Sequence, residues 1–258
     1  MTSRYRCALD GIELGEIDES LIITDIAYDA PARSISTAEN GRYDGARVTR
    51  VRTVSQSVTI SFEIHERDTR RRMEVCSAAQ AWAMRGGYLT TGDRPGQRLF
   101  VLCDTPPMIA SALRWTDRIR MRLVSYALPF WEDELPTRCA LNGTSGEKTV
   151  FAPGFAADPF VEAQVKNTGG GVVNALTLRA GDTKLVFGAL GLQSGGTLSV
   201  AYEAGHVLSI RVGGETAYHR RLLQSDDDLR MKVGKRNGLS FEAGGTVNVT
   251  YTFRGLYV

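Results

Sequence analysis

The 258-residue sequence lacks any apolar run that approaches the roughly 20 residues of a membrane-spanning helix. Its opening stretch, Met1 to Cys7, has no apolar segment of the kind found in secretory signals, so we expect none. An excess of one charge sign is also missing, because 31 lysines and arginines face 29 acidic residues and leave a net charge of +2. This balance gives no support to a role on nucleic acid or at a membrane surface.

Cysteine is scarce and scattered, at Cys7, Cys76, Cys103 and Cys139. No two of the four form a CxxC pair, and none has a histidine at the spacing of a metal site. An even number leaves two disulfides open. Without a secretion signal, we expect four reduced thiols, most of them buried as small apolar side chains.

The chain also lacks the residue patterns of known catalytic sites. The three histidines, His65, His206 and His219, have no acidic residues at metalloprotease spacing, and no Gly-x-Ser-x-Gly elbow is present. Thr168 to Gly171 does not read as a phosphate loop, since no helix or Lys-Ser/Thr follows it. We therefore expect no catalytic, cofactor or metal site, and a protein that is not an enzyme.

Two charge clusters have simpler explanations than a ligand site. In Asp226-Asp227-Asp228 the oxygen ligands do not alternate as a calcium loop requires, so we expect a solvated loop. Arg70-Arg71-Arg72 is surrounded by acidic residues. We expect an exposed helix start that pairs with those neighbours or with a partner subunit, rather than a nucleic-acid site.

The first half of the chain reads as strands around one helix. Alternation at Val58, Ile60, Phe62 and Ile64 is typical of a strand with one buried face. A polar stretch over 30–45 predicts a long loop, which in a compact domain is usually functional or packs on a partner. The predicted strands are 4–9, 20–27, 47–64, 88–91, 98–103, 110–115 and 119–128.

The one predicted helix covers about residues 69–85. Asp68 suits its N-cap and Gly86-Gly87 its end. Its expected buried stripe is Met73, Cys76, Ala79 and Ala83, flanked by Val75 and Trp82.

After Pro129 the composition changes. Histidine aside, every basic residue before Lys148 is an arginine, and all three tryptophans (Trp82, Trp115, Trp131) precede it, so we place a domain boundary within 132–150. Short strands with glycine-rich turns then predict a β-sandwich or jelly roll. Loops are expected at 142–146 and turns at 168–171, 180–182, 194–196, 212–214 and 243–245. The predicted strands are 161–165, 176–179, 184–187, 197–202, 207–212, 215–220, 240–242 and 246–253.

Sugar binding is the main alternative to a purely structural role for this half, because jelly rolls often bind glycans. Sugar rings stack best on tryptophan, and none follows Trp131. The tyrosines at 202, 218, 251 and 257 could stack, but they are explained as simply by core or cross-strand packing.

The order of these segments resembles the distal tail protein, or baseplate hub, of long-tailed (siphovirus-type) bacteriophages. An N-terminal strand region is followed by the alternating strand, one helix, a hairpin and a strand that ends in Pro129-Phe130-Trp131. Further on, 157–163 opens the second half, 222–238 is a long polar insertion and 247–254 closes it. The resemblance spans nearly the whole chain and rests on order and length. It implies a mainly β fold with one helix: a ring-forming β domain over 1–135 and a galectin-like β-sandwich (jelly roll) over 136–258.

Membership of that family would imply a structural virion protein of a phage tail tip. Such proteins form a hexameric ring that joins the tail tube to the tip or tail-associated lysin and serves as an assembly hub for other baseplate or receptor-binding proteins. The protein would be made and assembled in the host cytoplasm, would use no cofactor, and would neither read nucleic acid specifically nor insert into a membrane. Pro129, Phe130 and Trp131 match the family pattern, and we expect them to be structural. A carbohydrate-binding adhesion module that contacts the host surface is the alternative function.

Overall fold

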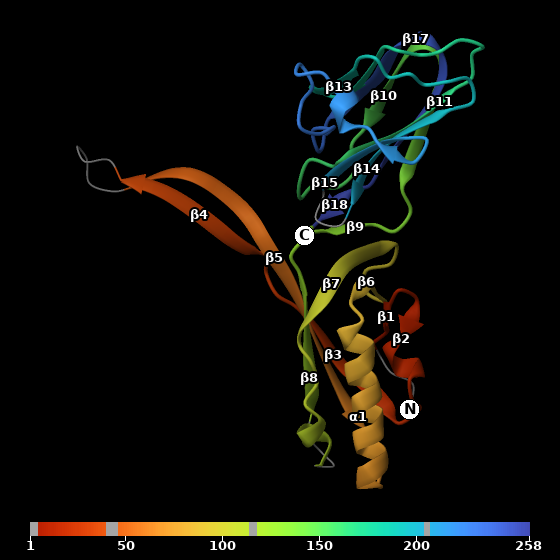
Figure 1. Ribbon diagram of the computed structural model, residues 1–258. Helices are drawn as coiled ribbons and strands as arrows, with labels where there is room; N and C mark the ends of the chain where they lie inside the picture. The colour runs from red at the N-terminus through yellow and green to blue at the C-terminus, as the bar shows by residue number, and fades with distance from the viewer. Residues whose placement is uncertain (1–4, 40–45, 114–117, 204–206) are drawn as a thin grey trace. The chain divides into compact units, whose positions relative to one another are not determined.

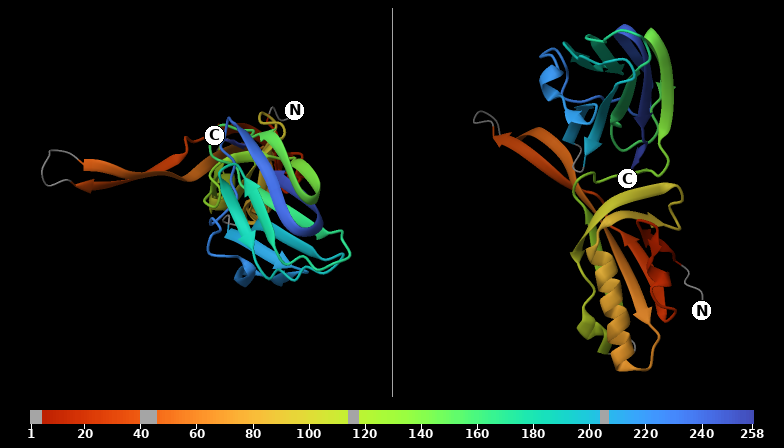
Figure 2. Two further views of the ribbon diagram at one scale, coloured as in Figure 1. Left: turned by 90° about the horizontal axis from the view of Figure 1, so that it is seen from above. Right: turned by 45° about the vertical axis from the view of Figure 1, so that its right-hand side comes forward.

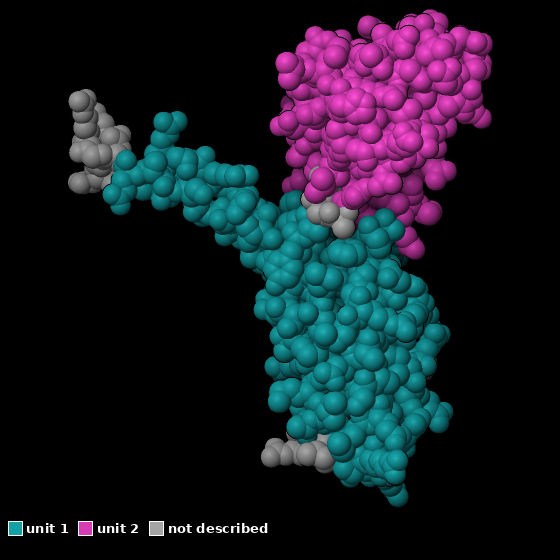
Figure 3. All heavy atoms as spheres, in the orientation of Figure 1, with its two compact units in different colours: residues 1–131 teal, residues 132–258 magenta. Residues whose placement is uncertain are grey.

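A computed structural model of the chain describes residues 5–39, 46–113, 118–203 and 207–258. The chain divides into two compact units, residues 1–131 and 132–258 (Figure 3). The described residues are mainly β with one α-helix, as predicted. Among the described residues, no helix is long and apolar enough to cross a membrane.

Unit 1 is built on one antiparallel sheet with the strand order β2-β1-β6-β7-β8-β5-β3 (Figure 1). The predicted alternation in its longest strand is confirmed, because Val58, Ile60, Phe62 and Ile64 are all buried. Two short 3-10 helices, η1 and η2, lie between strands. The bounds are β1 Cys7–Leu9, β2 Ile12–Glu13, η1 Leu14–Glu16, β3 Leu21–Tyr28, β5 Ala46–Ile64, β6 Gly87–Thr91, β7 Gln97–Thr105, η2 Ile109–Leu113 and β8 Ile119–Ser125.

The helix α1 spans Thr69–Met84 and buries one face in unit 1. The Asp68 side chain caps its start, accepting a hydrogen bond from the Arg70 backbone N–H at 2.9 Å. At its end Gly86 takes a left-handed φ of +63°, which glycine adopts without strain. The predicted stripe needs one correction, because Met73 is 37% exposed while Arg72 is buried.

Two expectations for unit 1 are wrong. The predicted loop over 30–45 contains a strand, β4 (Ala32–Glu39), which pairs with the first part of β5. A two-stranded ribbon has no core face, so its strands need no apolar alternation, and the polar composition hid it. The predicted strand over 110–115 lies in η2 instead, and its Trp115 falls outside the described residues.

Unit 2 is one antiparallel sheet that two long strands fold into a sandwich (Figures 1 and 2). The C-terminal part of β17 pairs with β11, while its N-terminal part pairs with β12. Its neighbour β10 follows the same bend through a bulge after Gly143. The core lies between the two halves and contains Leu178, Leu198, Phe241 and Tyr251.

The bend of these strands explains two further errors, since the predicted loop at 142–146 and turn at 243–245 lie inside continuous strands. A bulge or kink within a strand uses the same glycines as a turn. The bounds are β9 Trp131–Asp133, β10 Thr137–Phe151, β11 Val161–Asn167, β12 Leu176–Ala180, β13 Thr183–Phe187, β14 Thr197–Glu203, β15 Val207–Val212, β16 Glu215–Thr216, η3 Tyr218–Arg220, β17 Arg236–Phe253 and β18 Leu256–Tyr257.

The segment between β16 and β17 covers the open edge of β13. The predicted strand over 215–220 stops at Thr216, and the chain then runs along β13: the Leu222 backbone N–H donates to the Val186 carbonyl at 2.8 Å. Asp226 exchanges hydrogen bonds with Lys184, its carboxylate accepting from the Lys184 N–H at 2.7 Å. This cover protects an edge strand that would otherwise expose unpaired backbone groups.

Candidate functional site

The most exposed ordered feature of unit 1 is a two-stranded ribbon, which we call the arm. It consists of residues 32–39 of β4 and 46–55 of β5. Figure 1 shows it extending beyond the sheet of unit 1, in which the rest of β5 lies between β3 and β8. Residues 46–52 are all exposed. A ribbon of this kind buries too little surface to be stabilised by itself, so its residues are free to serve binding.

One face of the arm has an apolar centre, between Arg33 and Glu39 at the two ends of the same face. The register pairs Ile35 with Val51 and Thr37 with Val48, and directly opposed residues project from the same face of a sheet. Ile35 is 61% exposed, Val48 55% and Val51 54%. Exposed β-branched side chains that gather on one face indicate a surface that another protein covers.

The other face of the arm carries arginines. Arg52 lies opposite Ser34, Arg50 opposite Ser36, and Arg47 opposite Ala38. A bulge at Thr49, between the pairs made by Arg50 and Val48, keeps the arginines and the apolar residues on opposite faces. The Thr49 hydroxyl donates to the Ser36 carbonyl at 3.0 Å. The small residues of β4 leave the three guanidinium groups uncovered. Arginine suits interfaces because its planar fork can bind carboxylates in a bidentate manner.

The root of the arm is fixed to the sheet by polar contacts. The Asp29 backbone N–H donates to the Ser57 carbonyl at 3.1 Å, and the Ser57 hydroxyl donates to the Asp29 carboxylate. Arg122 of β8 donates to the Ser57 hydroxyl at 3.1 Å and pairs with Asp104 at 3.4 Å. These contacts tie the strand that enters the arm to its neighbours on both sides.

Trp131 lies in a buried aromatic cluster at the end of unit 1. Its ring is fully buried and meets Tyr28 edge-on, with 5.8 Å between centroids. The Arg94 guanidinium lies 4.9 Å from the centroid of each ring, a cation–π arrangement. The expectation that Trp131 is structural agrees with this burial.

The Tyr28 hydroxyl, the polar group at the end of this cluster, has hydrogen-bond partners. The Tyr28 hydroxyl donates to Asp93 at 2.6 Å and lies 2.9 Å from the Thr91 hydroxyl. Burial, and then the Asp93 carboxylate, raises the pKa of Tyr28. Burial alone would raise the pKa of Asp93, but hydrogen bonds from Tyr28 and Thr91 outweigh it and hold that pKa below its ordinary value.

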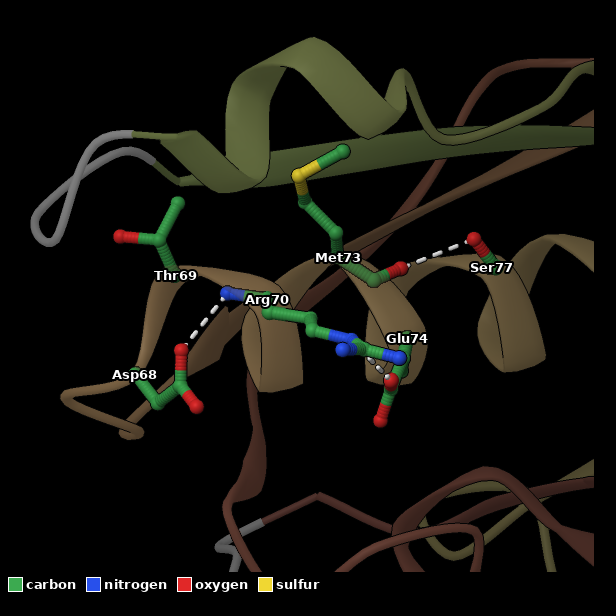
Figure 4. A pocket seen from close by; sticks show the side chains of 6 residues that line it. All are labelled: Asp68, Thr69, Arg70, Met73, Glu74 and Ser77. Carbon is green, nitrogen blue, oxygen red and sulfur yellow. Dashed lines mark hydrogen bonds and ion pairs between the residues drawn. The ribbon is translucent and has the colours of Figure 1, made fainter.

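The start of α1 forms a hollow lined by six residues, drawn in Figure 4: Asp68, Thr69, Arg70, Met73, Glu74 and Ser77. Its two carboxylates already have partners. Asp68 caps the helix, and Glu74 pairs with Arg70 at 3.3 Å. The hollow therefore offers no group poised to act as an acid, base or nucleophile.

The arginine triplet separates into two kinds of residue. Arg70 and Arg71 are exposed and pair with acidic neighbours as predicted, Arg71 reaching Asp18 at 2.6 Å. Arg72 is 5% exposed, which was not predicted. Its guanidinium donates to the carbonyls of Ala112, Glu66 and Arg67 at 2.8–2.9 Å and so joins α1 to η2 and to the preceding loop.

The remaining sequence candidates do not converge on a site. Among residues 5–39, 46–113, 118–203 and 207–258, no group of three histidine, cysteine or acidic side chains could hold a metal ion. Of the three aspartates at 226–228, Asp226 binds the β13 backbone, and Asp228 pairs with Arg230 at 2.6 Å. His65 lies beside Glu63 at 3.1 Å, whereas His206 is outside the described residues.

The four cysteines are unpaired, and all but Cys103 are buried, as predicted. Burial raises the pKa of the Cys7 thiol to about 12, with a smaller contribution from Glu13. A thiol with so high a pKa stays protonated at neutral pH and is a poor nucleophile.

The fold of this chain, a helix-backed β domain followed by a β-sandwich, is similar to that of solved phage hub and baseplate proteins. The chain superposes on the Dit protein of phage SPP1, described as a paradigm of the hub adsorption apparatus in phages that infect Gram-positive bacteria, with a TM-score of 0.64. The match covers 96% of this chain and 98% of that one at 14% sequence identity. A chain of the phage P2 baseplate in its activated conformation matches with a TM-score of 0.50 and 7% identity, covering 99% of this chain and 98% of that one.

At these identities the likeness establishes the fold, and it extends over both units. No protein-family model matches the sequence, and no curated protein matches it.

Proposed function

We propose that the protein is a structural component of a phage tail tip: a hexameric ring that joins the tail tube to the tip and acts as an assembly hub. The observation that carries this proposal is the full-length fold likeness to the SPP1 hub protein. The exposed arm supports it, because a ribbon with exposed apolar side chains at the centre of one face and three arginines on the other is suited to binding a neighbouring protein.

The proposed partners are further copies of the chain, a tail tube protein and a tail-tip or tail-associated lysin protein. Other baseplate or receptor-binding proteins would dock on the same hub. The protein would act in the virion after synthesis and assembly in the host cytoplasm. No catalytic step is part of the proposal, since assembly alone accounts for the surfaces described.

The test is the mass and shape of the purified protein in solution. Native mass spectrometry should give a species six times the mass of the 28.2 kDa chain, and negative-stain electron microscopy should show rings. A protein that remains monomeric at all concentrations would contradict the proposal.

Glycan binding by unit 2 stays the alternative, and two of its four candidate tyrosines, Tyr202 and Tyr218, differ in accessibility. Tyr202 packs on Phe160, with 4.7 Å between ring centroids, and its hydroxyl accepts a hydrogen bond from the Leu229 N–H at 2.8 Å. It is thus a packing residue, whereas Tyr218 is 42% exposed. Saturable binding of host cell-wall polysaccharide that is lost in Tyr218→Ala would favour the alternative.

A further inference from the structure

Charge is strongly segregated along unit 1. No lysine or arginine occurs between Arg6 and Arg33, a stretch that contains seven carboxylates. The described part of the arm has the opposite balance, four arginines against Glu39 alone. The seven are Asp10, Glu13, Glu16, Asp18, Glu19, Asp25 and Asp29; the four are Arg33, Arg47, Arg50 and Arg52.

Some exposed charges of the arm and of the acidic stretch have no ion-pair partner among the described residues. In the part that the structure describes, Arg47, Arg50 and Arg52 form no ion pair. Glu16 and Glu19 are exposed and likewise have no basic partner among the described residues, unlike Asp18, which binds Arg71. Exposed charges that remain unpaired in one copy are available to a second.

The acidic segment also lies beside an open sheet edge. Within the described residues β3 pairs only with β5, so its other edge is unpaired. Glu16 ends η1 and Glu19 lies two residues before β3 begins. The arm has an open edge too, because β4 pairs only with β5, and both open strands are eight residues long.

We propose that the arm of one copy docks on the acidic segment of the next copy, with Arg47, Arg50 and Arg52 facing Glu16, Glu19 and the β3 edge. This inference rests on the proposed ring and names the surfaces that close it. The arm and the acidic segment are different surfaces, so the contact is head-to-tail, as a closed ring requires. Opposite charges also select the correct partner during encounter.

A charge reversal on the arm tests the inference. The variant Arg47→Glu, Arg50→Glu, Arg52→Glu should lose the ring and run as a monomer in light scattering, with an unchanged melting temperature because all three residues are exposed. A matched control, Arg138→Glu, Lys148→Glu, Lys166→Glu, reverses three exposed cations of unit 2 and should keep the ring.

Complementation then separates a docking role from an indirect effect. Glu16→Arg with Glu19→Arg should also give monomers. Mixing these with the arm variant leaves one intact arm and one intact acidic segment in different chains, facing charges of the sign that each needs. The reversed arm and the reversed segment are complementary to each other as well, so the mixture should form rings in which the two variants alternate. Both sets of reversals in one chain should restore ring formation, at least in part.

Rings that survive the arm reversal, or two variants that remain monomeric when mixed, would overturn the inference. If the charge-reversed variant has a lower melting temperature, the neutral variant Arg47→Gln, Arg50→Gln, Arg52→Gln is tested in its place. It should also lose the ring, and a ring that survives in it would overturn the inference. If the unmodified protein forms no ring, the proposed function fails as well. A ring that is insensitive to the arm leaves the proposed function standing and rejects this inference alone.

Discussion

At the scale of single residues, Trp131 is the sharpest case, because its indole is fully buried between Tyr28 and Arg94. Replacing it with alanine removes a large apolar side chain and leaves a cavity. Trp131→Ala should lower the free energy of unfolding by about 3–5 kcal/mol. Urea denaturation followed by circular dichroism measures this.

The matched control for this prediction is Trp131→Phe. It keeps an aromatic ring against Tyr28, and the indole nitrogen that it removes has no hydrogen-bond partner among the described residues. The phenylalanine variant should therefore lose clearly less stability than the alanine variant. An alanine variant that melts normally but no longer binds a tail protein would mean that Trp131 is a binding residue instead.

Arg70 and Arg72 are only two residues apart in the sequence but lie in opposite environments: Arg72 is buried and Arg70 is exposed. Arg72→Met leaves the buried Ala112 carbonyl and the part-buried carbonyls of Glu66 and Arg67 without their charged donor and should cost about 1.5–3 kcal/mol. Arg70→Met removes only an exposed pair with Glu74 and should change stability by about 0.5 kcal/mol or less. Equal effects in parallel denaturant titrations would show that the Arg72 network adds nothing.

At the scale of elements, Asp158 joins two segments of unit 2: the loop that precedes β11, in which it lies, and the segment that precedes β17. Its carboxylate accepts from the Val233 N–H at 3.0 Å and from the Lys232 ammonium at 2.9 Å. Burial alone would raise the pKa of Asp158, but these hydrogen bonds outweigh it and hold the pKa below 3.8. Since the folded pKa is the lower one, this stabilisation is full at neutral pH and is lost below pH 3.8, as the pH falls through the lower pKa of the folded state.

We therefore expect the stability difference between the unmodified protein and Asp158→Asn to be largest near neutral pH and to shrink in acid. Denaturant titrations of both proteins at several pH values measure it. Asp227→Asn is the control: that side chain is fully exposed and lies 4.0 Å from Arg221, so its difference should stay small throughout. A difference for Asp158→Asn that does not change with pH would contradict the assigned hydrogen bonds.

Elements with a strong local signal were predictable, and those defined by distant contacts were not. The alternation of β5 and the Asp68 cap of α1 are properties of a few adjacent residues. The strand β4 lacks such a signal, because neither of its faces is buried. Likewise β17 contains Gly244 and Gly245, which predict a turn, yet pairing with β10 and β12 keeps the strand continuous.

The candidate site was predicted only in part, for the same reason. Composition pointed to an arginine-rich first half and to a functional segment over 30–45, but the two faces of the arm depend on register. A one-residue shift of pairing would place Ile35 opposite Arg50 or Arg52, on the face that carries the arginines. Burial of Arg72 was equally hidden, since only the folded chain brings the Ala112 carbonyl to it.

At the scale of the whole molecule, we expect unit 1 by itself to mediate ring assembly. Residues 1–135, expressed alone, should form oligomers of the same copy number as the full chain, because the arm and the acidic segment both lie in this part. Residues 136–258 should be monomeric. Native mass spectrometry of the two pieces measures their copy numbers. Self-association found only in residues 136–258 would mean that unit 2, and not unit 1, mediates ring assembly.

The long pairing of β10 with β17 has a mechanical consequence. The two strands are antiparallel, and Thr137, near the start of unit 2, lies opposite Phe253, near its end. Tension applied between these two points would peel the strands apart one hydrogen bond at a time, at low force. Tension between Thr137 of β10 and Arg236 of β17, which lies opposite Phe151 at the other end of the pair, would load the same bonds together in shear. Unit 2 should thus resist pulling in one direction far better than in the other, a property of strand direction alone.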